Sequence, residues 1–140
     1  ATGGHAVRGN YCIHNHLGVI LRIIAKIIKI MDYKWYEEMN CAVTVCDNDG
    51  NIIFMNRKSR DTFAEGTDRL VGSNLRACHS DRSWDTIQRL LKTGGTNSYT
   101  IHKKGVKKMI YQTAWFENGK VMGLVEISMV IPEEMPHYER

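Results

Sequence analysis

The stretch "AVTVCDNDGNIIFMN", residues 42–56, reads as two strands joined by a tight turn. Val43 and Val45 alternate with polar or smaller residues, which is the period of a strand with one buried face. The sequence Asn48–Gly50 supplies turn chemistry between the two runs. Asn56 closes the second run and is a preferred N-cap residue. The stretch therefore predicts a β-hairpin that leads directly into a helix.

The segment before this hairpin has a helical period instead. Its apolar residues recur three and four positions apart, at Leu17, Ile20, Ile24, Ile27 and Met31. Arg22, Lys26 and Lys29 fall on the opposite side, so residues 14–39 are predicted to form one amphipathic helix. Three roles stay open: packing on its own domain, a helix–helix dimer seam, or a basic helix on a membrane surface. An exposed apolar stripe normally marks an interface, so we expect a homodimer built on these five residues.

The segment after the hairpin predicts further short helices and then three strands. Ser80 is a preferred N-cap, Trp84 begins the apolar face of a helix over residues 81–93, and Gly94 is a typical C-terminal stop. The three strands are expected at about residues 97–103, 106–116 and 121–131, separated by Lys104-Gly105 and Asn118-Gly119. Two strands, helices and three more strands predict an α+β fold: a five-stranded antiparallel sheet with helices on one face.

Length and composition limit the class of protein. A chain of 140 residues is the size of one domain. The expected division is a disordered arm or expression remnant at 1–13, the helix at 14–39, the domain at 40–132 and a tail at 133–140. The net charge of +4 is mild, and the basic segment 102–108 reads as a solvated hairpin tip, so no nucleic-acid partner is expected. Charges interrupt every apolar run before it reaches the about 20 residues of a membrane span.

The four cysteines also carry information about the compartment. They stand at positions 12, 41, 46 and 78 and form no C-x-x-C pair, so a disulfide framework is not expected and a cytoplasmic location is favoured. Cys41 and Cys46 flank a strand and are expected to be core residues.

Four motifs in this order resemble those of a PAS domain, over about residues 40–131. "AVTVCDNDGNIIFMN" is similar to the family's opening hairpin, "TDRLVGSNL" (67–75) to its acidic and Leu-x-Gly-x-x-Leu step, and "GKVMGLVEISMVI" (119–131) to its last strand. "NLRACHSDRSWDTI" (74–87) resembles a PAS subgroup with a Cys-His pair at this point, although Ser80 stands where that subgroup usually has proline.

The resemblance implies a sensory or interaction module. Such modules hold a small ligand between sheet and helices, or hold none, and dimerise through a helix that precedes the first strand. They pass a signal to an output domain, which here is unknown. The sequence thus predicts a signalling module that binds a small ligand or a partner protein, and the alternative is a dimerisation module with a filled core. Candidate pocket residues are Met55, Phe63, Leu75, Cys78, His79, Trp84, Ile87, Tyr111, Thr113 and Trp115.

The cofactor stays open between none, haem and flavin. Leu75 stands where light-sensing PAS domains have a reactive cysteine, which argues against a flavin photoadduct. His79 or Cys78 is the candidate axial ligand for haem. No second close pair accompanies them, so no metal site is expected. The preferred role for Cys78 is a small buried side chain, the preferred role for His79 is a hydrogen bond to the backbone at the helix start, and a thiol sensor is the alternative.

Signs of an enzyme are absent from the sequence. It has no glycine-rich phosphate loop, no G-x-S-x-G motif and no paired carboxylates around a cleft. Asp81, Asp85 and Glu126 are scattered and are expected to be solvated surface residues. We therefore expect no catalytic residues.

Overall fold

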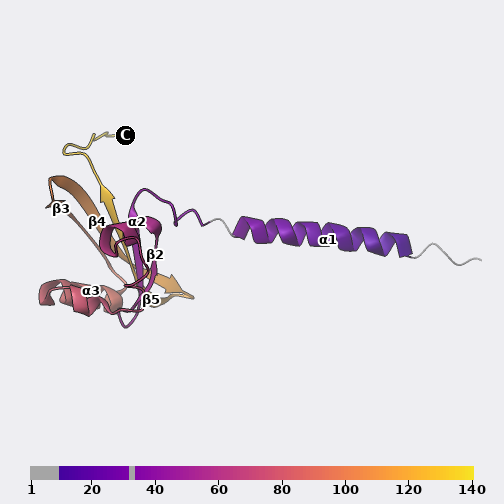
Figure 1. The fold of residues 1–140 in the computed structure, drawn as a ribbon, viewed down its shortest axis with the longest axis horizontal. Coiled ribbons are helices and arrows are strands. Elements are labelled where there is room, and N and C mark those ends of the chain that lie inside the picture. The colour runs from indigo at the N-terminus through magenta and orange to yellow at the C-terminus, as the bar shows by residue number, and fades with distance from the viewer. Residues whose placement is uncertain (1–9, 32–33) are drawn as a thin grey trace, which may run out of the picture. The chain divides into compact units, whose positions relative to one another are not determined.

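The computed structural model describes residues 10–31 and 34–140, with side chains in the first helix described for residues 16–26. The chain divides into two units, residues 1–34 and 35–140, each described here by itself. The elements, coloured along the chain in Figure 1, are α1 (Asn10–Met31), β1 (Ala42–Asp47), β2 (Ile52–Met55), α2 (Arg57–Phe63), the 3₁₀ helix η1 (Leu75–Cys78), α3 (Asp81–Thr93), β3 (Thr96–Lys103), β4 (Val106–Glu117) and β5 (Lys120–Val130).

The second unit is built on one five-stranded sheet in the order β2-β1-β5-β4-β3. Every neighbouring pair is antiparallel. The predicted five-stranded antiparallel sheet is therefore confirmed. The register places Asn97, Gln112, Glu126 and Thr44 side by side in one row across four strands. Because side chains alternate along a strand, the four residues of this row point to the same face of the sheet.

Both helices of this unit cover that same face. In α2, the Ser59 hydroxyl lies 2.6 Å from the Thr44 hydroxyl of β1. In α3, Ile87 and Leu90 are buried in one cluster with Cys46 and Leu124, which are paired neighbours in β1 and β5. The helix-covered face therefore carries the core, as the α+β prediction requires.

The ends of the two helices are fixed by the capping residues that the sequence predicts. The Asn56 side chain accepts a hydrogen bond from the Ser59 backbone N–H at 2.9 Å. The Ser80 hydroxyl accepts from the Ser83 N–H at 3.4 Å. The helix α3 starts at Asp81, directly after Ser80. Gly94 ends α3 with a left-handed backbone, φ 68°, which glycine adopts without steric cost. The predicted bounds 81–93 are confirmed.

The first helix differs from its predicted bounds of 14–39. It runs over Asn10–Met31, and residues 35–38 form turns. In these turns the aromatic ring of Tyr36 packs edge-on against Phe54 of β2, with ring centroids 5.2 Å apart. The Tyr36 carbonyl accepts a hydrogen bond from Asn56. These tertiary contacts replace the bonds that a continued helix would make, so the predicted extension through residue 39 is wrong.

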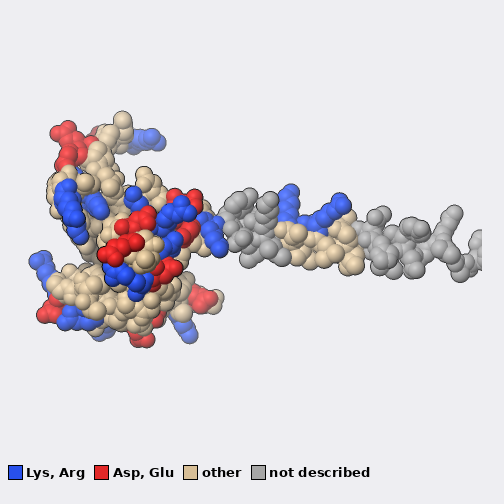
Figure 2. Space-filling model, in the orientation of Figure 1, with Lys and Arg blue, Asp and Glu red and all other residues tan. Residues whose placement is uncertain are grey.

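The described part of α1 has basic residues on one side and exposed apolar residues on the rest (Figure 2). Of the predicted dimer stripe, Leu17, Ile20 and Ile24 are about half exposed. The side chains of Ile27 and Met31 lie outside the described residues. Among the described helices, none combines the length and apolar content that crossing a bilayer requires.

Candidate ligand-binding site

A cavity of about 340 Å³ lies between the helix-covered face of the sheet and the helices. Its apolar wall consists of Cys46, Ile52, Met55, Phe63, Leu70, Leu75, Cys78, Ile87 and Leu124. Its polar wall consists of Thr44, His79, Lys103, Gln112 and Glu126. A mostly apolar hollow with a few convergent polar groups is the usual form of a small-molecule site.

The hollow borders two separate clusters of buried side chains. One cluster joins α3 to β1 and β5 and contains Ile87 and Leu124. The other joins β2 to the end of α2 and contains Ile52 and Met55. Leu75 packs against both clusters. The space that these clusters leave between them is the cavity, and η1 forms the wall where they meet.

The segment that leads into η1 is tied to the β1–β2 hairpin. The Asn74 side chain donates to the Asp49 carbonyl at 2.8 Å and to the Asn51 side chain at 2.9 Å. Its own oxygen accepts from the Arg76 N–H at 2.9 Å and caps η1. The Leu75 N–H donates to the Gly50 carbonyl at 2.9 Å. These bonds fix the wall residues Leu75–His79 relative to the sheet.

A chain of amide and carboxylate groups crosses the sheet under the cavity. The Asn97 amide donates to Gln112 Oε1 at 2.9 Å, and Gln112 Nε2 donates to Glu126 Oε2 at 2.8 Å. Gln112 is buried, with 5% of its surface exposed. The three side chains lie in one row of the register, on β3, β4 and β5. The row therefore holds the Glu126 carboxylate in a fixed orientation at the cavity wall.

The ring of His79 is held in one tautomer by the backbone. Its Nδ1 lies 2.8 Å from the Leu75 carbonyl oxygen. A carbonyl only accepts, so Nδ1 carries the hydrogen, and Nε2 of the neutral ring is left with a lone pair. The predicted hydrogen bond of this histidine to the backbone is confirmed. A nitrogen lone pair on a wall residue is also the arrangement that could ligate haem iron.

The pKa of the Cys78 thiol lies above its ordinary value. Desolvation by its surroundings raises the pKa of the Cys78 thiol, and the negative charge of Glu126 raises it further. Because the thiolate is the reactive form, a raised pKa leaves this cysteine less reactive at neutral pH than a free thiol. Cys78 is exposed, in contrast to the predicted packed position, whereas Cys41 and Cys46 are buried as predicted.

Six of the ten predicted pocket residues line the cavity: Met55, Phe63, Leu75, Cys78, His79 and Ile87. The other four lie elsewhere. The indole of Trp84 lies over Gly50, where an added Cβ would come within 2.7 Å of it. Tyr111, Thr113 and Trp115 alternate along β4 with Gln112, which faces the cavity, so they point to the opposite face of the sheet.

Several cavity residues were not predicted as site residues. They are Thr44, Cys46, Ile52, Leu70, Lys103, Gln112, Leu124 and Glu126. The most informative is Glu126, which was expected to be a solvated surface residue and instead borders the cavity. The available signal was its position in the middle of the apolar strand "VMGLVEISMV", where a charge is unusual.

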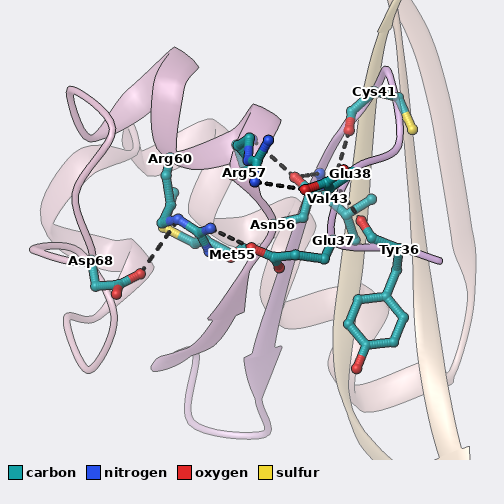
Figure 3. A network of polar contacts seen from close by, with 11 residues as sticks. Tyr36, Glu37, Glu38, Cys41, Val43, Met55, Asn56, Arg57, Arg60 and Asp68 are labelled. Atoms are coloured by element: carbon teal, nitrogen blue, oxygen red, sulfur yellow. Dashed lines mark hydrogen bonds and ion pairs between the residues drawn. The ribbon is translucent and has the colours of Figure 1, made fainter. Parts of the chain in front are cut away.

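The segment that follows α1 in the chain is bound to the domain by a polar network (Figure 3). Asn56 Nδ2 donates to the carbonyls of Tyr36 and Cys41, both at 2.9 Å. The Arg60 guanidinium donates to the Glu37 carboxylate and, at 2.5 Å, to the carbonyl of Met55. Arg60 therefore joins a cavity-lining residue of β2 to the chain that leads out of α1.

No three His, Cys, Asp or Glu side chains gather into a possible metal site within residues 16–26 and 34–140. A cofactor held in the cavity would contact the groups of the cavity wall. Among them, His79 offers a nitrogen lone pair and Glu126 a carboxylate.

The comparisons with known proteins agree on one family. A family model described as the PAS fold matches residues 36–134. The PAS domain of a protein from Colwellia psychrerythraea is 19% identical, with a TM-score of 0.57, over 76% of this chain and 99% of that chain. A sensory box sensor histidine kinase from Vibrio cholerae is 11% identical, with a TM-score of 0.56, over 79% of this chain and 97% of that chain.

A third similar structure is described as VqmA bound to DPO, and VqmA is a protein of Vibrio cholerae. It is 12% identical, with a TM-score of 0.60, over 74% of this chain and 58% of that chain. At these identities the likeness concerns the fold. No curated protein matches the chain.

Proposed function

Since the chain belongs to the PAS fold family through residues 36–134, we propose that it is a sensory module that binds a small ligand in the cavity between sheet and helices. The observation that carries this proposal is the cavity of about 340 Å³ inside the domain. A module that served only to dimerise would be expected to fill this space with side chains, since apolar core residues normally pack without voids larger than a water molecule. The cavity therefore favours a ligand-binding role over a filled dimerisation module.

The relatives are consistent with this role. One is described as a sensor histidine kinase and another as bound to DPO. The first description is that of a sensory protein, and the second is that of a protein with a bound ligand. What these relatives bind is not carried over to this chain, whose cavity has its own set of polar groups.

We further propose that the signal leaves the domain through α1, which pairs with α1 of a second copy. The apolar stripe of Leu17, Ile20 and Ile24 is exposed in the single chain and recurs at the spacing of a helix–helix seam. Arg60 offers the connection, because it binds both the carbonyl of the cavity residue Met55 and the carboxylate of Glu37. A ligand that shifts β2 would shift the chain segment that follows α1.

Native mass spectrometry of the full chain tests both parts at once. The protein is mixed with a small-molecule extract of cells and exchanged into volatile buffer. We expect a dimer that carries one small adduct per subunit. A Leu75→Trp variant, which fills the cavity, should give a dimer without the adduct. The matched control, Tyr111→Trp on the opposite face of the sheet, should keep the adduct.

The assembly is tested by variants of the stripe in the same measurement. Ile20→Glu combined with Ile24→Glu should give a monomer that still carries the adduct, because charges in an apolar seam are costly. Arg22→Glu, on the other side of α1, should remain a dimer. A wild-type protein without any adduct would contradict the ligand-binding role, and a wild-type monomer would contradict the dimer.

A further inference from the structure

The cavity has a carboxylate at its sheet-side wall, Glu126, that forms no ion pair among the described residues. Glu126 borders both the interior cavity and the adjoining groove of about 430 Å³ between β3, β4 and α2. In the part of the chain that the structure describes, the ion pairs involve other carboxylates, and Glu126 takes part in none. A carboxylate that is partly removed from water attracts a cationic group of opposite charge.

The hydrogen bonds of Glu126 leave one of its oxygens free for a ligand. Its Oε2 accepts from Gln112 Nε2, and Gln112 is oriented in turn by the amide of Asn97. The buried Gln112 thus presents its N–H₂ group to Glu126 and not to the cavity. The other carboxylate oxygen has no protein partner among the described hydrogen bonds, so this end of the cavity offers an acceptor.

A second acceptor lies on the α3 side of the same cavity. The Nδ1–H group of His79 is used by the Leu75 carbonyl, so the lone pair of Nε2 in the neutral ring is unused. His79 borders the interior cavity and the adjoining groove, as Glu126 does. The two side chains therefore mark the same end of the site, and both can accept a hydrogen bond from a ligand.

The charge of Glu126 extends to the surrounding wall. Burial is the main cause that raises the pKa of the Cys46 thiol, the Cys78 thiol and the Tyr99 hydroxyl, and the negative charge of Glu126 raises each of them further. Three groups on β1, η1 and β3 thus experience the same carboxylate.

One positive side chain, Lys103, also borders the cavity and the groove. It is exposed, and Lys104 and Lys108 of the same hairpin border the groove but not the cavity. Its ammonium group forms no ion pair with Glu126 in the described structure. Lys103 therefore lies at the solvent-exposed edge of the site, and the Glu126 carboxylate has no ion-pair partner among the described residues.

We infer that the ligand of this cavity is a small molecule with an apolar body and a cationic nitrogen group, an amine or amidine, whose N–H donates to Glu126. The apolar body fits the wall formed by Ile52, Met55, Leu75 and Leu124, and the cationic group meets the acceptor end of the row across the sheet. This inference rests on the proposed ligand-binding function and specifies the chemistry of that same site.

Three probes of the same shape and different charge test it: benzamidine, benzamide and benzoate. Each is titrated into the full-length ¹⁵N-labelled protein, and the dissociation constant is read from the amide shifts of the cavity residues. We expect benzamidine to bind about tenfold more tightly than benzamide. This factor corresponds to the low end of the free energies measured for hydrogen bonds to charged groups, because Glu126 keeps some contact with water. Benzoate should bind most weakly.

Variants assign the preference to one side chain. Glu126→Gln keeps the acceptor for Gln112 and should make benzamidine and benzamide equal. Glu126→Asp keeps the charge and should retain part of the preference for benzamidine. This second variant keeps the inference testable if Glu126→Gln fails to fold. The matched control Glu117→Gln removes the same charge from an exposed site at the end of β4 and should change nothing.

The outcomes separate this inference from the proposed function. Equal binding of the three probes at the cavity, or tighter binding of benzoate, would overturn the cationic ligand and leave the ligand-binding function intact. The absence of shifts at the cavity residues with all three probes would overturn both. A preference for benzamidine that survives in Glu126→Gln would assign it to another group and overturn the role of Glu126.

Discussion

Replacing Asn56 with alanine is expected to lower the free energy of unfolding by about 4 kcal/mol or more, which approaches the whole stability of a small domain. Asn56 is fully buried. Its Oδ1 accepts from the backbone N–H groups of Val43 and Ser59, and its Nδ2 donates to the carbonyls of Tyr36 and Cys41. Alanine leaves all four backbone groups without this partner, and each buried unpaired group costs about 1–3 kcal/mol.

Urea unfolding followed by circular dichroism measures this loss. The matched control is Asn48→Ala, because Asn48 makes one exposed hydrogen bond, to the Val121 carbonyl at 2.8 Å. That variant should lose less than about 1 kcal/mol. Equal small losses in both variants would mean that Asn56 does not organise the junction between residues 36–41, β1 and α2.

Replacing Gly123 with alanine is expected to have the second large effect. An added Cβ would lie 1.8 Å from the Cys46 carbonyl oxygen and 2.6 Å from Trp115 Nε1. A side-chain movement cannot relieve the first contact, because it is with the backbone of the neighbouring strand β1. The variant must also strain the hydrogen bond of 3.1 Å from Trp115 Nε1 to that same carbonyl. The expected loss is about 4 kcal/mol, in the range of the most disruptive single substitutions.

Differential scanning calorimetry should show this loss as a melting temperature lowered by about 20 °C. The control is Gly18→Ala in α1, where nothing lies within 4 Å of the added Cβ. This variant should leave the melting of the domain unchanged. A Gly123→Ala protein that melts with the wild type would show that β1 and β5 do not approach each other as closely as described.

The elements with strong local signals could be predicted from the sequence. The change from a 3.6-residue to a 2-residue period near residue 40, the Gly-containing turns and the capping residues Asn56 and Ser80 are all local features. These features predicted the antiparallel sheet and the bounds of α3. The end of the first helix could not be predicted, because residues 35–38 are helix-compatible by composition and are held in turns by contacts with β2 and α2.

The orientation of β4 explains the incomplete prediction of the site. Apolar or aromatic residues stand on both faces of this strand, with Tyr111 and Trp115 on one face and Ile110 and Ala114 on the other. Size suggested that the aromatic residues face the helices. The structure places the smaller residues and Gln112 there, where α3 packs on the sheet, and the Trp115 indole lies on the other face beside Gly123.

The role of Glu126 depends on tertiary structure alone. A single glutamate in a strand has no local pattern that distinguishes a solvated carboxylate from one that borders a cavity. Its environment follows from the register, which aligns it with Gln112 and Asn97. Both of these residues lie far from Glu126 in the sequence. Only the assembled sheet brings the three polar side chains into one row.

The most direct test of the central claim is to locate a bound probe by nuclear Overhauser effects between benzamidine ring protons and protein methyl groups. A ligand between sheet and helices should give effects to Met55, Ile87 and Leu124, which line the cavity. Met109 and Ile127 alternate with residues of the helix-covered face and therefore lie on the opposite face of the sheet. Effects to these two methyl groups, without effects to the cavity residues, would contradict the assignment of the cavity as the ligand site.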